Sequence, residues 1–430
     1  MIKSKNKYLD YKKSIVLNML IGTLIMRYFL SLQQYPNLFL YRILLPVTTI
    51  YVLFRIAIND SIVFNKKNYF ILFYYFLYSA STVIWVINFN SYLVELFYLT
   101  SNLFLFFIVN ILINNKSKLL SAIKTIYLFY ILGLIVGLWE VITMNHLRSS
   151  KFTIEYNWPV RSTTSWFYNP NEFGIFIVFI LPIAYYFLNR SKKTHYKVFN
   201  LIIIILSFVL LGYTDSRLSM SASLIQLLLC VLFYNKSKVK RMKISSIIFI
   251  GPMFVLSILA LFIYNPSFLN NFISRVTSQL LSIFYEGNNI GGSIEVRFQI
   301  YKTVIKMFCN SFLAGVGLGQ IPEYISGYNI SINTTNVHSF IFDIIVETGI
   351  PGFLLFMSFI FKVVSDSLRM LKKDINYEEK ELIYTILNSI GVYLLITNFG
   401  ANTVHITSII WLFLAILTSI NRVIEYPNSK

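Results

Sequence analysis

The 430 residues are strongly apolar: 56% are hydrophobic and 13% are charged. A soluble protein carries about a quarter charged residues, so this composition excludes an ordinary soluble globular protein. The formal net charge of +19 would suit nucleic acid, but lysine and arginine concentrate in short segments beside apolar stretches, as in residues 235–243 (NKSKVKRMK). We therefore interpret the charge as the basic excess of cytoplasmic loops and expect no nucleic-acid partner.

Apolar stretches of roughly 20 residues, the length that a membrane-spanning helix needs, recur along the whole chain. Lysines precede the first stretch without a clear cleavage site, which favours a retained first span. The pattern predicts an all-α, polytopic membrane protein of about twelve spans that forms a single integral membrane domain, residues 1–430. The predicted spans are 14–30, 38–58, 69–88, 93–113, 119–142, 172–189, 198–213, 217–234, 244–264, 338–363, 383–400 and 404–421.

Basic residues alternate along the connections between these spans. Because cytoplasmic loops carry an excess of lysine and arginine, the alternation predicts that both termini lie in the cytoplasm. It also predicts that every second connection is cytoplasmic. Those connections contain Lys66 and Lys67, Lys116 and Lys118, Arg190, Lys192 and Lys193, residues 236–243, and Arg369, Lys372 and Lys373.

The same alternation places two long connections on the outer side, residues 143–171 and 265–337. Within the longer one, apolar residues recur at helical spacing from Phe268 to Phe284 and again from Arg297 to Phe308. Amphipathic helices of this kind can lie along a membrane surface. We therefore expect interfacial helices in the large outer loop.

Three arginines are predicted at outer span boundaries or in outer loops: Arg161, Arg217 and Arg297. An arginine near the membrane is costly unless it is paired or hydrated, and its planar guanidinium binds phosphate oxygens in pairs. The arginines could therefore form an anion-binding site on the outer face. The alternative for each is an interfacial anchor or an ion pair, such as Arg217 with Asp215 or Arg297 with Glu295.

A second candidate is the segment NVHS, residues 336–339, which enters an apolar helix carrying Asp343 and Glu347. Histidine exchanges a proton near neutral pH, so His338 could act as a base. The alternative is that His338 caps the helix or lies at the membrane interface. Asp343 and Glu347 are four residues apart and share one helix face.

Other motifs give weaker signals. The glycines of residues 315–319 (GVGLG) lack the spacing and the preceding strand of a nucleotide-binding loop, so they favour a tight turn or a close backbone approach. Asn169 and Asn171 flank Pro170 in a turn signal that closes the first outer loop. The four histidines and two cysteines show no metal-ligand spacing, and we expect no metal and no cofactor.

Four segments, in this order, resemble the O-antigen ligase and polymerase superfamily, whose polymerases are called Wzy-like. They are NPNEFG (169–174), TDSR (214–217), RFQIYKTVIKMF (297–308) followed by AGVGLGQIPEY (314–324), and NVHSFIFDIIVETGIPGFLLF (336–356). The resemblance covers mainly residues 161–363. This chain departs from the family in having Ser339 where asparagine commonly follows the histidine, and Phe312 or its neighbours where a proline commonly precedes the glycine-rich turn.

The resemblance implies a GT-C-like membrane glycosyltransferase of the bacterial cytoplasmic (inner) membrane, with its active site on the outer face. Such enzymes move a glycan from undecaprenyl diphosphate to an acceptor hydroxyl. Arg217 and Arg297, with Arg161, would hold the diphosphate, and His338 would orient or deprotonate the acceptor, with inversion at the anomeric carbon. Supporting roles would fall to Asn169, Asn171, Asp215, Asn336 and Glu347.

Our first functional hypothesis is a polymerase that joins lipid-linked repeat units into a capsule, O-antigen or similar polysaccharide. A ligase that passes the glycan to a lipid or protein acceptor is the second, and a flippase is the alternative from another class. A transporter places ionisable groups at the bilayer midplane, whereas Glu140 and Asp343 are predicted towards outer span ends. Expected partners are the lipid-linked donor and acceptor and the bilayer, with a flippase and a chain-length regulator as candidates.

Overall fold

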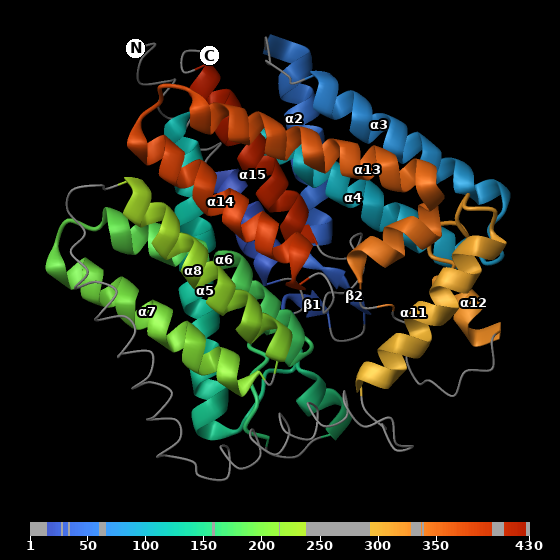
Figure 1. Ribbon diagram of the computed structural model, residues 1–430, viewed down its shortest axis with the longest axis horizontal. Helices are drawn as coiled ribbons and strands as arrows, with labels where there is room; N and C mark the ends of the chain where they lie inside the picture. The colour runs from blue at the N-terminus through green and yellow to red at the C-terminus, as the bar shows by residue number, and fades with distance from the viewer. Residues whose placement is uncertain are drawn as a thin grey trace.

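The computed structural model describes residues 15–26, 29–32, 35–59, 66–156, 160–214, 216–237, 293–327, 337, 339–397 and 408–426. These residues form a bundle of helices (Figure 1), which confirms the all-α prediction. A small antiparallel ribbon of β1 (Ser31–Leu32) and β2 (Tyr35–Phe39) was not foreseen. The predicted span 244–264 and the predicted helix at 268–284 lie outside the described residues.

The helices follow the predicted spans in chain order, after a first apolar helix at Ile15–Ile25. They are α2 (Leu40–Asn59), α3 (Lys66–Ser81), α4 (Phe89–Leu112), α5 (Lys116–Thr143), α6 (Pro170–Arg190), α7 (Thr194–Tyr213), α8 (Arg217–Ser237), α11 (Ser293–Asn310), α12 (Ile321–Gly327), α13 (Phe340–Lys372), α14 (Tyr377–Leu395) and α15 (Ser408–Glu425). A 3₁₀ turn, Thr82–Ile84, and a π-helical turn, Phe152–Tyr156, lie in the connections.

Six helices among the described residues are long and apolar enough to cross a membrane, namely α4, α5, α6, α7, α13 and α15. Shorter apolar helices occur at Ile15–Ile25, Leu40–Phe54 and Leu218–Val231. The chain is therefore a multi-pass membrane protein. The predicted helix within the large outer loop is present as α11, whose side chains Ile300 and Val304 are buried.

One predicted span, residues 69–88, is shorter as a helix than expected. The helix α3 ends at Ser81. The Ser81 hydroxyl donates to the Tyr78 carbonyl at 2.7 Å, and the Thr82 hydroxyl donates to the Ser79 carbonyl at 2.8 Å. Such side-chain bonds compete with the helical backbone pattern. The following residues turn, and Asn88 caps α4 by accepting from the backbone N–H groups of Asn90 and Ser91.

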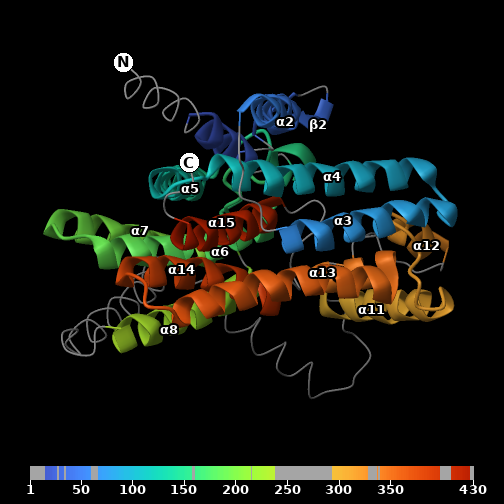
Figure 2. The ribbon, with the colours of Figure 1, turned by 90° about the horizontal axis from the view of Figure 1, so that it is seen from above.

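The helices α6 and α15 form the centre of the bundle. Almost all of the side chains from Phe173 to Tyr186 are buried, as are those from Ile410 to Ile420. The helix α6 packs against α7, α8 and α14, while α15 packs against α4, α13 and α14. Figures 1 and 2 both show α13 alongside α3, with α11 and α12 against the part of α13 where that helix begins.

Several connections meet at one end of the bundle, which we call the basic end and define by Lys116, Arg190 and Lys373. Lys116 Nζ lies 3.4 Å from Glu378 Oε2, and Arg190 Nη2 lies 3.2 Å from the same oxygen. Lys373 Nζ lies 2.9 Å from Glu425 Oε1. Three connections that the charge pattern assigns to the cytoplasm are therefore neighbours in the structure.

Four further connections lie at the opposite end, which we call the loop end and define by residues 85–88, 144–156, 160–169, 214, 216 and 311–320. The helix α4 begins here and ends beside the basic end, so the two groups lie at opposite ends of this helix. Trp85 Nε1 donates to the Gly315 carbonyl at 3.1 Å, and Gln320 Oε1 accepts from the Asn88 N–H at 2.8 Å. Segments predicted to lie outside are thus joined by hydrogen bonds.

Candidate functional site

The first outer loop returns into the bundle directly after Arg161. Arg161 is exposed, but the five residues that follow it are between 0% and 5% exposed although their backbone is irregular. Trp166 packs against Phe176 of α6. Irregular backbone at the end of a membrane bundle is stable only where other groups satisfy its hydrogen bonds. The surroundings of residues 162–166, which we call the re-entrant segment, therefore matter for the position of Arg161.

A buried carboxylate accepts several of the hydrogen bonds that this segment donates. Glu140, one turn before the end of α5, is 0% exposed. Its Oε2 accepts from Thr163 Oγ1 at 2.9 Å, from the Thr164 N–H at 2.8 Å and from the Ser165 N–H at 2.7 Å. Its Oε1 accepts from Thr164 Oγ1 at 3.0 Å. Four donors from three consecutive residues therefore share one carboxylate.

The imidazole ring of His146 lies beside the same carboxylate. Its Nδ1 lies 3.4 Å from Glu140 Oε1, and its side chain is 3% exposed. Its Nε2 donates to the Val160 carbonyl at 3.0 Å. Val160 directly precedes Arg161, so the chain before this arginine is bonded to a ring that lies beside Glu140, although Nδ1 forms no hydrogen bond with the carboxylate.

The opposite side of the re-entrant segment contacts the end of α7. Ser162 Oγ donates to the Tyr213 carbonyl at 3.1 Å, and the Thr163 N–H approaches the same carbonyl at 3.3 Å. Tyr213 is the last residue of α7, and Arg217 is the first residue of α8. The structure thus brings the segment containing Arg161 to the tight turn that leads to Arg217. The side chain of Arg217 and the whole of Asp215 lie outside the described residues.

Asn169 serves as the N-cap of α6. Its Oδ1 accepts from the Glu172 N–H at 3.0 Å, its Nδ2 donates to Glu172 Oε1 at 3.2 Å, and Pro170 occupies the first helical position. This capping arrangement satisfies backbone groups at the helix start. The side chain of Asn169 is therefore engaged within the protein, whereas Asn171 is exposed.

The start of α6 lies beside the turn before α8. A Cβ added to Gly174 would lie 2.7 Å from Ser219 Oγ and 3.3 Å from Ser216 Cβ. The absence of a side chain at Gly174 thus allows α6 and α8 to approach closely. The NPNEFG and TDSR motifs, which are about 45 residues apart in the sequence, are consequently neighbours at the loop end.

The remaining candidates belong to α11 and α13. Arg297 lies in the second turn of α11, which packs against α13, and its side chain lies outside the described residues. His338 and Asn336 also lie outside them. Ser339 is the N-cap of α13, and Glu347 is 3% exposed within that helix.

The glycine-rich loop, residues 315–319, packs directly on α13 at a kink. Gly349 has φ +64° and ψ −171°, and the Gly317 N–H donates to the Glu347 carbonyl at 2.9 Å. A Cβ on Gly315 would lie 2.4 Å from the Gly349 nitrogen. The expectation of a close backbone approach is therefore confirmed, and its partner is α13.

Glu95 of α4 is a residue that the sequence analysis missed. It interacts electrostatically with Asp343 and Glu347, and its Cγ lies 3.0 Å from the position that a Cβ on Gly319 would take. A single acidic residue in an otherwise apolar helix could have signalled it. Within the described part of the chain, no group of three His, Cys, Asp or Glu side chains could hold a metal ion.

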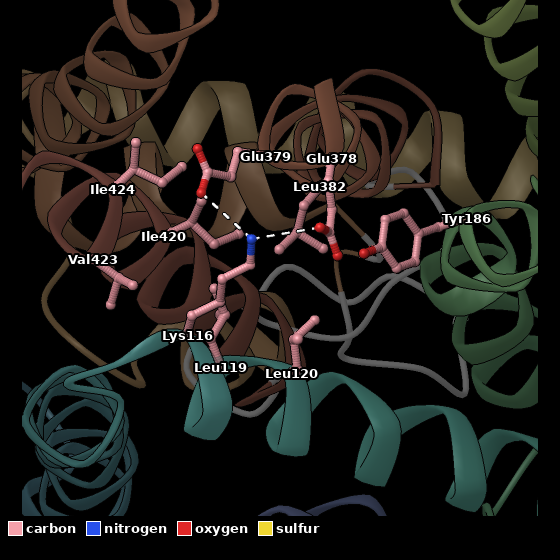
Figure 3. Close-up of a pocket in the computed structure, with 10 residues that line it drawn as sticks. All are labelled: Lys116, Leu119, Leu120, Tyr186, Glu378, Glu379, Leu382, Ile420, Val423 and Ile424. Carbon is pink, nitrogen blue, oxygen red and sulfur yellow. Dashed lines mark hydrogen bonds and ion pairs between the residues drawn. The ribbon is translucent and has the colours of Figure 1, made fainter. Parts of the chain in front are cut away.

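A hollow at the basic end is separate from all of these residues (Figure 3). Lys116 points into it between Glu378 and Glu379, and the rest of the wall is formed by Tyr186 and by apolar side chains such as Leu382. Its volume is about 10 Å³, which is room for roughly one water molecule. A glycan does not fit there, and the charged groups already pair with one another. An adjoining open hollow of about 500 Å³ shares Lys116 and Glu379 with it.

Comparison with known proteins gives two matches. A family model described as O-antigen ligase matches residues 202–357, a range that includes Arg217, Arg297 and His338. The chain is also 20% identical over 408 residues to the teichuronic acid biosynthesis protein TuaE of Bacillus subtilis (strain 168). That alignment covers 90% of this chain and 80% of the relative.

Proposed function

We propose that this multi-pass membrane protein, which is similar to the O-antigen ligase family and to TuaE, is a polysaccharide polymerase. In this proposal it joins oligosaccharide repeat units carried on undecaprenyl diphosphate into a bacterial surface polysaccharide. Both comparisons support an enzyme of membrane polysaccharide assembly of the ligase or polymerase type.

The observation that carries the proposal is the pair of contacts from Ser162 and Thr163 to the Tyr213 carbonyl. These contacts bring the chain at Arg161 to the turn before Arg217. Two guanidinium groups in one region would suit a diphosphate, because each presents several N–H donors in a planar fork. The third arginine, Arg297, is on α11.

The reaction that we propose needs no change in oxidation state. The acceptor hydroxyl oxygen attacks the anomeric carbon, and the bond from that carbon to the diphosphate oxygen breaks. Arg161, Arg217 and Arg297 would stabilise the negative charge that develops on the departing diphosphate. His338 would orient the hydroxyl or take its proton. Attack opposite the leaving group inverts the anomeric carbon, and this scheme calls for no metal.

We further propose that the loop end faces the outside of the bacterial cytoplasmic membrane. The grouping of Lys116, Arg190 and Lys373 at the opposite end supports this orientation, because basic residues favour the cytoplasmic side. Both termini would then be cytoplasmic. Cysteine substitutions at exposed Asn145 and at exposed Lys192, each combined with Cys309→Ser to remove the exposed native thiol, provide a test. A membrane-impermeant thiol reagent on intact cells should label position 145 and spare position 192.

Transfer by the purified protein tests the arginine site. In vesicles that contain lipid-linked repeat units, Arg217→Ala and Arg297→Ala should each abolish formation of longer chains. Arg190→Ala at the basic end is the matched control and should retain transfer, since Arg190 pairs with Glu378 far along the bundle from the loop end. Normal transfer by both loop-end variants would refute the arginine site.

Deleting the gene separates the polymerase from the two other hypotheses. Single lipid-linked repeats that accumulate on the outer face support a polymerase. Full-length chains without an anchor identify a ligase, and repeats trapped on the inner face identify a flippase. A flippase or a chain-length regulator would be a candidate partner of the polymerase.

A further inference from the structure

We propose that Glu140 is a positioning residue that sets the location of Arg161 for the diphosphate of the lipid-linked donor. The inference rests on the proposed function, and it adds a residue on α5 outside the four sequence motifs. Glu140 does not contact the substrate in this proposal. It acts through the backbone that follows Arg161.

Arg161 is followed by residues bonded to Glu140 and preceded by a residue bonded to His146. After Arg161, residues 163–165 direct four donors to Glu140 at 2.7–3.0 Å. Before Arg161, the Val160 carbonyl accepts from His146, whose other ring nitrogen faces Glu140. Hydrogen bonds thus hold the chain at Val160 and at residues 163–165, on either side of the exposed Arg161.

The helix α5 is shaped to receive this segment. A Cβ on Gly137 would lie 2.8 Å from Thr163 Oγ1, and a Cβ on Gly133 would lie 3.0 Å from Trp166 Cζ2. Ser165 has a positive φ of 52° and donates from its hydroxyl to the Gly133 carbonyl at 3.0 Å. A residue other than glycine rarely adopts such a φ unless its surroundings impose it. The segment is thus docked into α5 in one conformation.

A negative charge at Glu140 suits this role better than a neutral side chain. Hydrogen bonds to a carboxylate are stronger than those to a neutral acceptor, and a carboxylate offers about four acceptor positions without any donor. A glutamine at the same place would direct its N–H₂ group towards the N–H and O–H groups of residues 163–165, which are themselves hydrogen-bond donors. An arginine that is already in place for the diphosphate lowers the conformational-entropy cost of binding the lipid-linked substrate.

Glu140→Gln tests the inference, with Glu381→Gln as the matched control. Glu381 is also 0% exposed and accepts from Asn189, but it lies at the basic end beside Arg190. Transfer by purified protein in vesicles is measured as kcat and KM for the lipid-linked donor. Glu140→Gln should raise the donor KM about tenfold, comparable to loss of one charged hydrogen bond, with a smaller change in kcat. Glu381→Gln should leave the donor KM unchanged.

A double-mutant cycle with Arg161→Ala separates positioning from general stability. If Glu140 acts through Arg161, adding Glu140→Gln to Arg161→Ala should change the donor KM by less than about twofold. A further rise of about tenfold in the double variant, as additive effects require, would overturn the inference. If Glu140→Gln cannot be purified folded, Thr163→Val removes one of the four donors and should show the same dependence on Arg161 with a smaller effect.

The outcomes also distinguish this inference from the proposed function. If Arg161→Ala leaves the donor KM unchanged while Arg217→Ala and Arg297→Ala abolish transfer, the role of Glu140 is refuted and the arginine site of the polymerase stands. If all three arginine variants transfer normally, the proposed site fails together with the inference.

Discussion

Replacing Gly349 with alanine should strongly destabilise the contact between α13 and the loop around Gly315. An added Cβ would lie 2.3 Å from the carbonyl carbon of Ala314, 2.4 Å from its oxygen and 2.5 Å from the Leu313 carbonyl oxygen. All three are backbone atoms, so no side-chain rotation relieves the overlap. The backbone of Gly349, with φ +64° and ψ −171°, is also a conformation that is essentially restricted to glycine.

The backbone strain and the atomic overlap together set the expected loss of stability. Holding a residue with a side chain in such a backbone conformation costs about 1–3 kcal/mol, and forcing atoms into a packed contact costs about 1–3 kcal/mol more. The free energy of unfolding of Gly349→Ala should therefore fall by about 2–6 kcal/mol. Titration with sodium dodecyl sulfate in mixed micelles, followed by tryptophan fluorescence, measures this change.

Gly391→Ala is the matched control for this experiment. Gly391 lies within α14, and no neighbouring atom comes within 4 Å of an added Cβ. Alanine in a helix interior is about 0.5–1 kcal/mol more favourable than glycine, so this variant should be equally stable or slightly more stable. Equal unfolding midpoints for Gly349→Ala and the unmodified protein would refute the close approach of α13 and the loop.

Three further predictions concern the two ends of the bundle. Asn169→Ala should lower the free energy of unfolding by about 1 kcal/mol through loss of the α6 cap, and Asn169→Asp should restore it; thermal unfolding measures both. Gly137→Ala should displace Thr163 and raise the donor KM in the vesicle assay, whereas Gly212→Ala, where the nearest atom is 4.0 Å away, should not. Lys116→Ala should cost less than about 1 kcal/mol, because its ion pairs are partly exposed, and should leave the transfer rate unchanged. A Lys116 variant with impaired transfer would instead implicate the basic end in the reaction.

Much of the architecture could be predicted from the sequence because the signals are local. The length of each apolar stretch indicated a spanning helix, and Asn169 with Pro170 indicated where α6 begins. The first outer loop, predicted at residues 143–171, agrees with an α5 that ends at Thr143 and an α6 that begins at Pro170. The early end of α3 was not predicted, since hydropathy does not register hydroxyl groups that bond back to the helix.

The candidate site depended more on tertiary structure. The charge alternation predicted that Arg161 and Arg217 lie on one membrane face, but only the folded chain shows that Ser162 and Tyr213 connect their segments. Glu95 has no motif around it, and its neighbours Asp343 and Glu347 come from a helix nearly 250 residues later. Contacts of this kind are set by helix packing, which hydrophobic periodicity does not specify.

Glu140 shows most directly what the sequence predicts and what the tertiary structure adds. Its sequence position predicted an acidic residue towards the outer end of a span, because the apolar stretch indicates depth and the charge alternation favours one direction. Its partners follow 23–25 residues later, in an irregular segment whose path no periodic pattern records. The sequence by itself therefore determined the helical class and the order of the apolar helices, and it predicted the face on which the candidate residues gather. Only the tertiary structure decided which donors surround each buried charge, because hydrogen bonds across a bundle depend on how the loops fold back between the helices.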